Sequence, residues 1–97
     1  MATYQILYWQ DIPSVVEARE GGEVKKEQLS QRFQELIDLV AMKKEMMGSD
    51  AYLEQWNKGP RQDRDGSAEA VAKAVAGEFE GNFDTIRSDA IAKCGND

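Results

Sequence analysis

Apolar residues follow two different periods in the two parts of this 97-residue chain. Up to residue 28 they lie on both faces of a strand-like segment or alternate weakly, as in β-strands, whereas from residue 31 onward they recur every three to four positions, as in amphipathic helices. Strands followed by helices are typical of an α+β domain, in which helices cover one face of a small antiparallel sheet. Because the length suits one domain, we predict a single α+β domain over residues 1–97.

Two or three strands are expected in the first part of the chain. Residues 3–9 carry aromatic and branched side chains on both faces, which indicates a central strand that ends near Gln10, before Pro13 breaks the pattern. Residues 14–19 alternate weakly, and the glycines that follow suit a tight hairpin turn. A third, charged strand over residues 24–28 would protect an exposed sheet edge with its lysines.

Three or four amphipathic helices are expected after the strands. The main one ends at Gly48, and a short one covers residues 50–57. Residues 58–66 are all polar or helix-breaking, so we expect a surface loop there. A third, alanine-rich helix and a final helix over residues 85–93 complete the chain. The residues expected to cap these four helices are Ser30, Ser49, Ser67 and Asp84.

The chain is acidic, with a net charge of −6 spread along its length. Such a chain would on average repel nucleic-acid phosphates and anionic lipid surfaces. The one locally basic stretch, residues 58–64, lacks the interleaved aromatic residues on which bases stack. We therefore expect neither nucleic acid nor a membrane as a partner.

Targeting signals and disulfides are not expected either. The sequence has no run of about 18 apolar residues and no signal-peptide pattern, so we expect a cytoplasmic protein. Cys94 is the only cysteine, which excludes an internal disulfide and favours a reducing compartment.

The composition also argues against catalysis. The chain has no histidine, which removes the commonest general base, the Ser-His-Asp and Cys-His nucleophile systems and the usual zinc ligands. Cys94 lies on the apolar side of the last predicted helix without an activating base, so we expect an inert thiol. Residues 63–66 resemble the centre of a calcium loop, but Arg61 and Ala72 replace two essential carboxylates. We predict no enzyme activity, no metal site and no cofactor.

Aromatic residues cluster in two short segments, each next to a polar turn. Trp9 is followed by Asp11 in the first segment, and Tyr52 and Trp56 lie in the second. Tyr and Trp are enriched at recognition surfaces because they offer large, stiff contact areas. The alternative is that they fill the core between sheet and helices. Met42, Met46 and Met47 leave the same two interpretations open, a contact patch or core filling.

Three blocks of the sequence carry a resemblance to a known family. Residues 7–16 (LYWQDIPSVV), 32–38 (RFQELID) and 49–56 (SDAYLEQW) resemble, in order and spacing, the small bacterial "virulence factor" family, which is also found as a domain of the conserved virulence factor C proteins. Gln10 and Val15 depart from the family pattern. The family has no assigned reaction, so the resemblance implies no particular chemistry. Its domain also occurs joined to helical-repeat scaffolds, which favours an interaction role. The family is also associated with operons of one-carbon and corrinoid methyl transfer.

Two hypotheses about function follow. The first is a non-catalytic accessory or protein-interaction domain, a monomer or small homo-oligomer, that docks on a protein partner. Its predicted partner-binding residues are Trp9, Asp11, Tyr52 and Trp56. The alternative is a small-molecule binding protein accessory to a metabolic enzyme. It would bind a folate, a tetrapyrrole or another anionic ligand between sheet and helices, with Arg61 or Arg64 contacting the anionic group.

Overall fold

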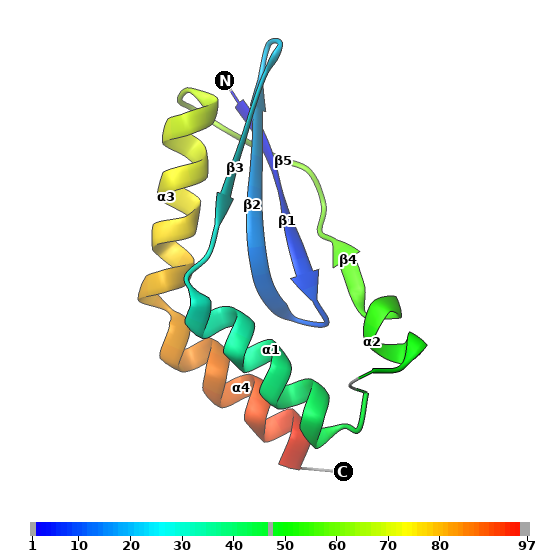
Figure 1. Cartoon of the computed structure of the whole chain (residues 1–97). Helices are drawn as coiled ribbons and strands as arrows, with labels where there is room; N and C mark the ends of the chain where they lie inside the picture. The colour runs from blue at the N-terminus through cyan, green and yellow to red at the C-terminus, as the bar shows by residue number, and fades with distance from the viewer. Residues whose placement is uncertain (1, 47, 96–97) are drawn as a thin grey trace.

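The structure is a computed structural model that describes residues 2–46 and 48–95, without the side chains of residues 94 and 95. It confirms the α+β class and the order of strands and helices (Figure 1). Within the described residues, no helix is long and apolar enough to cross a membrane. The elements are β1 (Ala2–Trp9), β2 (Ile12–Glu20), β3 (Glu23–Gln28), α1 (Gln31–Lys43), α2 (Asp50–Glu54), β4 (Trp56–Lys58), β5 (Gln62–Arg64), α3 (Ala68–Gly81) and α4 (Phe83–Gly95).

One antiparallel sheet contains all five described strands, in the order β3-β2-β1-β4, with β5 also paired to β1. β1 is therefore the central strand, as predicted from its apolar residues, and the charged β3 lies at an edge. The two short strands β4 and β5 share the outer side of β1. Between them the amide of Gly59 donates to the carbonyl of Ile6 at 2.9 Å, so the pairing continues across the gap.

The sheet differs from the prediction of two or three strands. Residues 58–66 were expected to form a loop and residues 56–57 the end of a helix, yet β4 and β5 lie there. Their polar side chains have little strand propensity. They are extended because the backbone groups along the outer side of β1 need hydrogen-bond partners. Tertiary pairing, rather than local sequence, makes these strands.

Proline and glycine also act differently from the prediction in two places. Pro13 does not end a strand but lies inside β2, beside the β-bulge where the pairing shifts between Leu7 and Tyr8. The turn between β1 and β2 lies at Gln10 and Asp11, where Gln10 adopts a φ of 53°. The predicted hairpin turn at Gly21 and Gly22 is confirmed and joins β2 to β3. α1 ends at Lys43, before Gly48.

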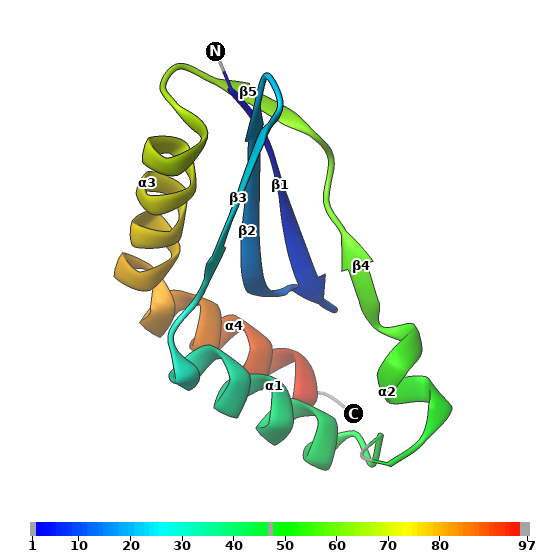
Figure 2. The same ribbon diagram turned by 45° about the horizontal axis from the view of Figure 1, so that its top comes forward.

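The described helices α1, α3 and α4 form one layer with the core between them and the sheet. α3 packs along β2 and β3, while α1 and α4 lie side by side near the end of the sheet (Figures 1 and 2). α2 stands apart from them, next to β4. The largest fully buried side chains of this core include Trp9, Ile12, Val16, Phe33, Ile37 and Val71.

Helix capping follows the prediction at one of the four sites and departs from it at the other three. The hydroxyl of Ser49 donates to the carbonyl of Met46 at 2.6 Å and does not cap α2, and Asp84 lies inside α4, which begins at Phe83. Ser67 caps α3, since its hydroxyl oxygen accepts a hydrogen bond from the amide of Ala70 at 3.2 Å. Ser30 precedes α1, but its hydroxyl bonds to Glu80 at 2.8 Å instead of capping its own helix.

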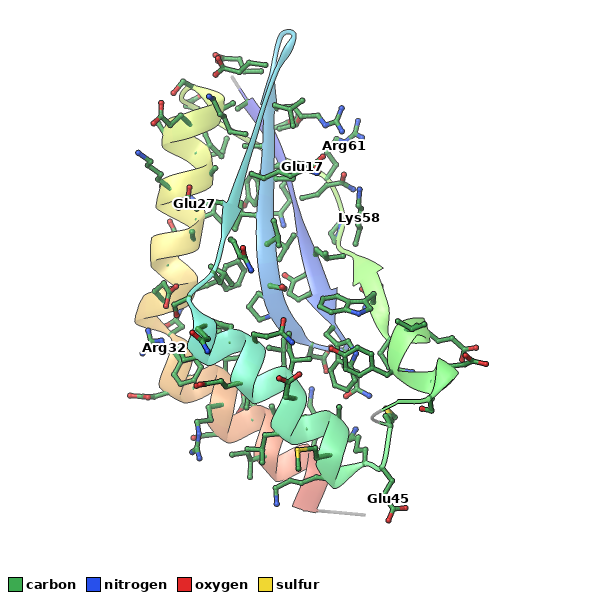
Figure 3. All side chains as sticks on the ribbon, in the orientation of Figure 1. Glu17, Glu27, Arg32, Glu45, Lys58 and Arg61 are labelled. Carbon is green, nitrogen blue, oxygen red and sulfur yellow. The ribbon has the colours of Figure 1, made fainter. Side chains whose placement is uncertain are left out.

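Glu80 holds together the corner where α1 begins and α3 ends. Its carboxylate accepts hydrogen bonds from the amide of Ser30 at 2.7 Å and from the guanidinium of Arg32 at 3.0 Å. Arg32 also donates to the carbonyl of Glu80 at 2.7 Å, and its guanidinium lies 4.3 Å from the centre of the Phe83 ring. Figure 3 labels Arg32 in this corner. Partial burial opposes the charge of Glu80, but the bonds from Ser30 and Arg32 outweigh it and lower the pKa of the carboxyl.

We expect Glu80→Gln to lower the free energy of unfolding by about 1 to 2 kcal/mol at neutral pH, because it removes charge-assisted hydrogen bonds. The pKa of Glu80 lies below its ordinary value of 4.5, so its contribution is complete above that pH and is lost as the pH falls through the lowered pKa. Urea unfolding followed by circular dichroism at several pH values measures this.

Glu78→Gln is the matched control on the same helix. Its ion pair with Arg64 is solvent-exposed, so we expect almost no change in stability. Equal losses in the two variants, or a Glu80→Gln loss that does not shrink at all as the pH is lowered below 4.5, would contradict the corner's role.

Candidate interaction surface

The sheet has a second face that points away from α3, here named the open face. Directly opposed residues of an antiparallel sheet point to the same side, so the register defines this face strand by strand. Ile6, Val16 and Ala18 point to the core and are buried. The residues between them point outward and are only half-buried or exposed. The open face comprises Thr3, Gln5, Leu7, Val15, Glu17, Arg19, Val24, Lys26, Gln28, Lys58 and Asp63.

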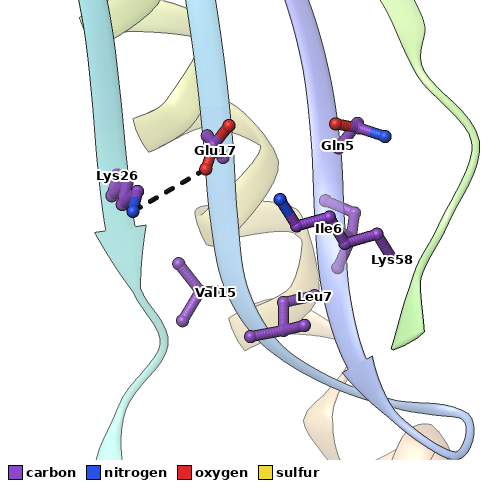
Figure 4. A pocket seen from close by; sticks show the side chains of 7 residues that line it. All are labelled: Gln5, Ile6, Leu7, Val15, Glu17, Lys26 and Lys58. Carbon is purple, nitrogen blue, oxygen red and sulfur yellow. Dashed lines mark ion pairs between the residues drawn. The ribbon is translucent and has the colours of Figure 1, made fainter. Parts of the chain in front are cut away.

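A shallow hollow of about 190 Å³ lies in the middle of the open face. Figure 4 views it from the open side, with helix ribbon behind the strands. Leu7 and Val15 are direct cross-strand neighbours and form its apolar part. Its lining residues are Gln5, Ile6, Leu7, Val15, Glu17, Lys26 and Lys58.

A cluster of charges surrounds Glu17 beside this hollow. The Glu17 carboxylate accepts two hydrogen bonds from Arg19, at 3.1 and 2.9 Å, and pairs with the Lys26 ammonium at 3.8 Å. The side chain of Glu17 is only 14 % exposed. The hydrogen bonds from Arg19, aided by the charges of Arg19, Lys58 and Lys26, lower the pKa of Glu17 against the opposing effect of burial. Glu17 therefore remains ionised, and three cations face one carboxylate.

The open face continues into an aromatic end, defined here as Tyr52, Leu53 and Trp56. The register places Trp56 opposite Trp9 and Lys58 opposite Leu7, so Trp56 and Lys58 point to the same side of β4. Tyr52 and Trp56 are half-buried and meet edge to face, with ring centres 6.3 Å apart, while Leu53 is 66 % exposed. The end of the open face thus carries stiff aromatic surface beside an exposed leucine.

Trp9 supports this end, since it is directly opposed to Trp56 and the two side chains point to the same side of the sheet. It is fully buried, and its indole nitrogen donates to the carbonyl of Tyr52 at 2.9 Å. Its ring centre lies 5.4 Å from that of Tyr52. For Trp9 the structure therefore favours core filling, and its side chain cannot offer a contact surface.

Asp11 lies in the exposed turn between β1 and β2, where its carboxylate pairs with Lys93 of α4 at 2.6 Å. Of the four predicted partner-binding residues, Tyr52 and Trp56 lie together at the surface, Trp9 is buried beside them, and Asp11 is held by α4.

The two arginines of the alternative hypothesis are not brought together at the hollow. Arg64 pairs with Glu78 of α3 at 2.8 Å, and this hydrogen bond raises the pKa of Arg64. Arg61 is exposed between β4 and β5. Neither residue lines the hollow of the open face.

The remaining candidate residues have separate positions. Met42 is 64 % exposed and Met46 packs partly against the core, while Met47 lies outside the described residues. The side chain of Cys94 also lies outside the described part of the chain, so its predicted inertness stays a prediction. Across residues 2–46 and 48–93, no three carboxylates are grouped closely enough to hold a metal ion.

Sequence reasoning missed the open face. A signal was present, because Leu7 and Val15 alternate with Ile6 and Val16 and so place apolar side chains on both sides of their strands. The α+β class predicted that helices cover one face of the sheet, but nothing in the pattern says which apolar side chains remain on the uncovered face.

These features define a class of protein, a small α+β domain whose antiparallel sheet has helices over one face and a mixed apolar and charged surface on the other. The chain belongs to the virulence factor family, whose model, described as "Virulence factor", matches residues 7–91. No curated protein and no solved structure gives a significant match.

We expect Trp9→Phe to destabilise the fold by about 2 kcal/mol, because it removes the shorter of the two hydrogen bonds to the Tyr52 carbonyl, leaving the one from the Gln55 amide at 3.3 Å, and opens space in the core. Circular dichroism during urea unfolding measures the loss. Leu53→Ala is the control, since this exposed neighbour should change stability by less than about 0.5 kcal/mol. Similar losses for both variants would show that Trp9 does not anchor the aromatic end.

Proposed function

We propose that this protein is a non-catalytic domain that binds a protein partner through the open face and its aromatic end. The observation that carries the proposal is the uncovered Leu7 and Val15 pair, which remains half-buried in a hollow although the core has formed on the other side of the sheet. Apolar hollows ringed by polar groups are typical of recognition surfaces.

The size of the hollow supports a protein partner over a small molecule. Small-molecule sites are usually clefts of roughly 300 to 1,000 Å³ that enclose most of the ligand. A hollow of about 190 Å³ on an open sheet is smaller and suits one anchoring side chain of a larger partner. The alternative role, binding an anionic small molecule, would use either Arg61, which does not line the hollow, or Arg64, which would have to leave its ion pair with Glu78.

The titration behaviour of the carboxylates supports a non-catalytic role. A general acid or base at neutral pH needs a pKa near 7, and for a carboxyl this requires an upward shift. Hydrogen bonds from cationic partners instead lower the pKa of Glu17, Glu69 and Glu78, and those from Ser30 and Arg32 lower that of Glu80. These groups stay ionised and serve as ion-pair partners.

Site-specific photocrosslinking in native cells tests the proposal. A photoreactive phenylalanine analogue replaces Val15 in the hollow or Leu53 at the aromatic end, and Ala74 on the exposed side of α3 serves as the matched control. We expect one discrete crosslinked protein from position 15 or 53, competed away by excess unmodified chain, and none from position 74. Thermal melts confirm that each variant is folded.

The proposal fails if positions 15 and 53 give no protein product, or the same products as position 74. A thermal-shift screen against folates, tetrapyrroles and phosphorylated metabolites examines the alternative, which predicts a stabilising compound whose effect is lost in Arg61→Ala.

A further inference from the structure

We infer that the partner segment on the open face is an acidic amphipathic helix. It places an apolar side chain in the hollow beside Leu7 and Val15, and carboxylates next to Lys26 and Lys58. This inference rests on the proposed function and names the chemistry of the partner.

The charge of the open face is opposite to that of the whole chain. Three cations, Arg19, Lys26 and Lys58, stand on this face against Glu17 and Asp63, which gives it a net charge of +1. The whole chain has a net charge of −6, so the acidic residues are concentrated elsewhere. Charge complementarity therefore favours an acidic partner at this one face.

Two of the three cations remain available to a partner. Arg19 is committed to Glu17 through two hydrogen bonds. The Lys26 ammonium lies 3.8 Å from the same carboxylate, which is beyond hydrogen-bond distance. Lys58 reaches the hollow from β4 and forms no ion pair among the described residues. Both ammonium groups retain donors for carboxylates of a bound segment.

The spacing of these lysines suits a helix. Lys26 lies on β3 and Lys58 on β4, three strand intervals apart, so about 14 Å of sheet separates their backbones. An α-helix with its side chains is about 10 to 12 Å across, which is comparable with this breadth of sheet, and the two lysine side chains lean inward toward Glu17 beneath it. Figure 4 shows Lys26 on the β3 side of the hollow and the Lys58 side chain extending from the β4 side over β1 toward Glu17, with Leu7 and Val15 nearby.

The narrow apolar strip makes that helix amphipathic. Leu7 and Val15 form one cross-strand pair, flanked on both sides by the polar Lys58 and Gln28. Only a narrow apolar stripe on the partner can therefore be buried here, and its remaining faces must stay polar. On the opposite face of the sheet, α3 packs in this way through Val71 and Val75, one helical turn apart.

A second copy of the chain suits this face less well. Two open faces brought together would oppose surfaces of the same net charge. A nucleic acid would meet the repulsion of the acidic remainder of the chain.

The test starts from the peptide that the Val15 crosslink captures, identified by mass spectrometry and synthesised as a fluorescent probe. We expect an apolar residue flanked by Asp or Glu at helical spacing, and a helical circular dichroism signal on binding. Anisotropy titrations should show at least tenfold weaker binding to the Lys26→Glu, Lys58→Glu double variant. Lys25→Glu is the matched control, because Lys25 neighbours Lys26 but points to the other face, and its affinity should stay within twofold.

The inference is overturned if the captured segment is basic or if the peptide binds as an extended strand. It is also overturned if the crosslink captures a nucleic acid or a second copy of this chain. Equal binding by the double variant and Lys25→Glu also overturns it, provided that thermal melts show both folded. If position 53 captures a protein and position 15 captures nothing, the acidic-helix inference fails while the proposed function stands.

Discussion

The carboxylate of Glu80 is the contact on which the arrangement of the helices depends. α1 begins directly after the edge strand β3, and α3 ends at Gly81, so the bonds from Ser30 and Arg32 tie the first helix to the last turn of the third. The guanidinium of Arg32 also stacks on Phe83, which fixes where α4 leaves the corner. Three helices are thereby held in one layer, and none of them lies over the other face of the sheet.

Because the helices cover only one side of the sheet, the apolar side chains of the open face are partly, but not fully, shielded from water. A chain of this length has apolar side chains for one modest core, and the strands send Ile6, Val16 and Ala18 into it. Leu7 and Val15 then remain on the outer side, where the stems of long polar side chains shield them in part. A sheet face of this kind is stable in contact with water, and covering its apolar part with a partner would lower the free energy further.

Much of the fold was predictable because its signals are local. The periods of two and of 3.6 residues separate strands from helices, and Ser67 caps α3 as its position predicts. β4 and β5 were not predictable, since residues such as Asn57 and Asp63 are extended only because β1 lies beside them. Trp9 illustrates the same limit at the site, because from the sequence alone its aromatic side chain could lie at the surface or in the core. Its burial depends on a hydrogen bond to the carbonyl of Tyr52, 43 residues away.

In the proposed complex, the position of Glu17 would give the open face its selectivity. Without that carboxylate, Arg19, Lys26 and Lys58 would form a cationic patch that attracts any polyanion. With it, Arg19 forms an ion pair with Glu17 at hydrogen-bond distance, and the charges of the two lysines that line the hollow are less completely compensated. A diffuse anion gains little from two separated lysines, whereas a segment with an apolar residue between two carboxylates satisfies the hollow and both flanks together. If the proposed partner binds here, geometry, more than total charge, would therefore discriminate between partners.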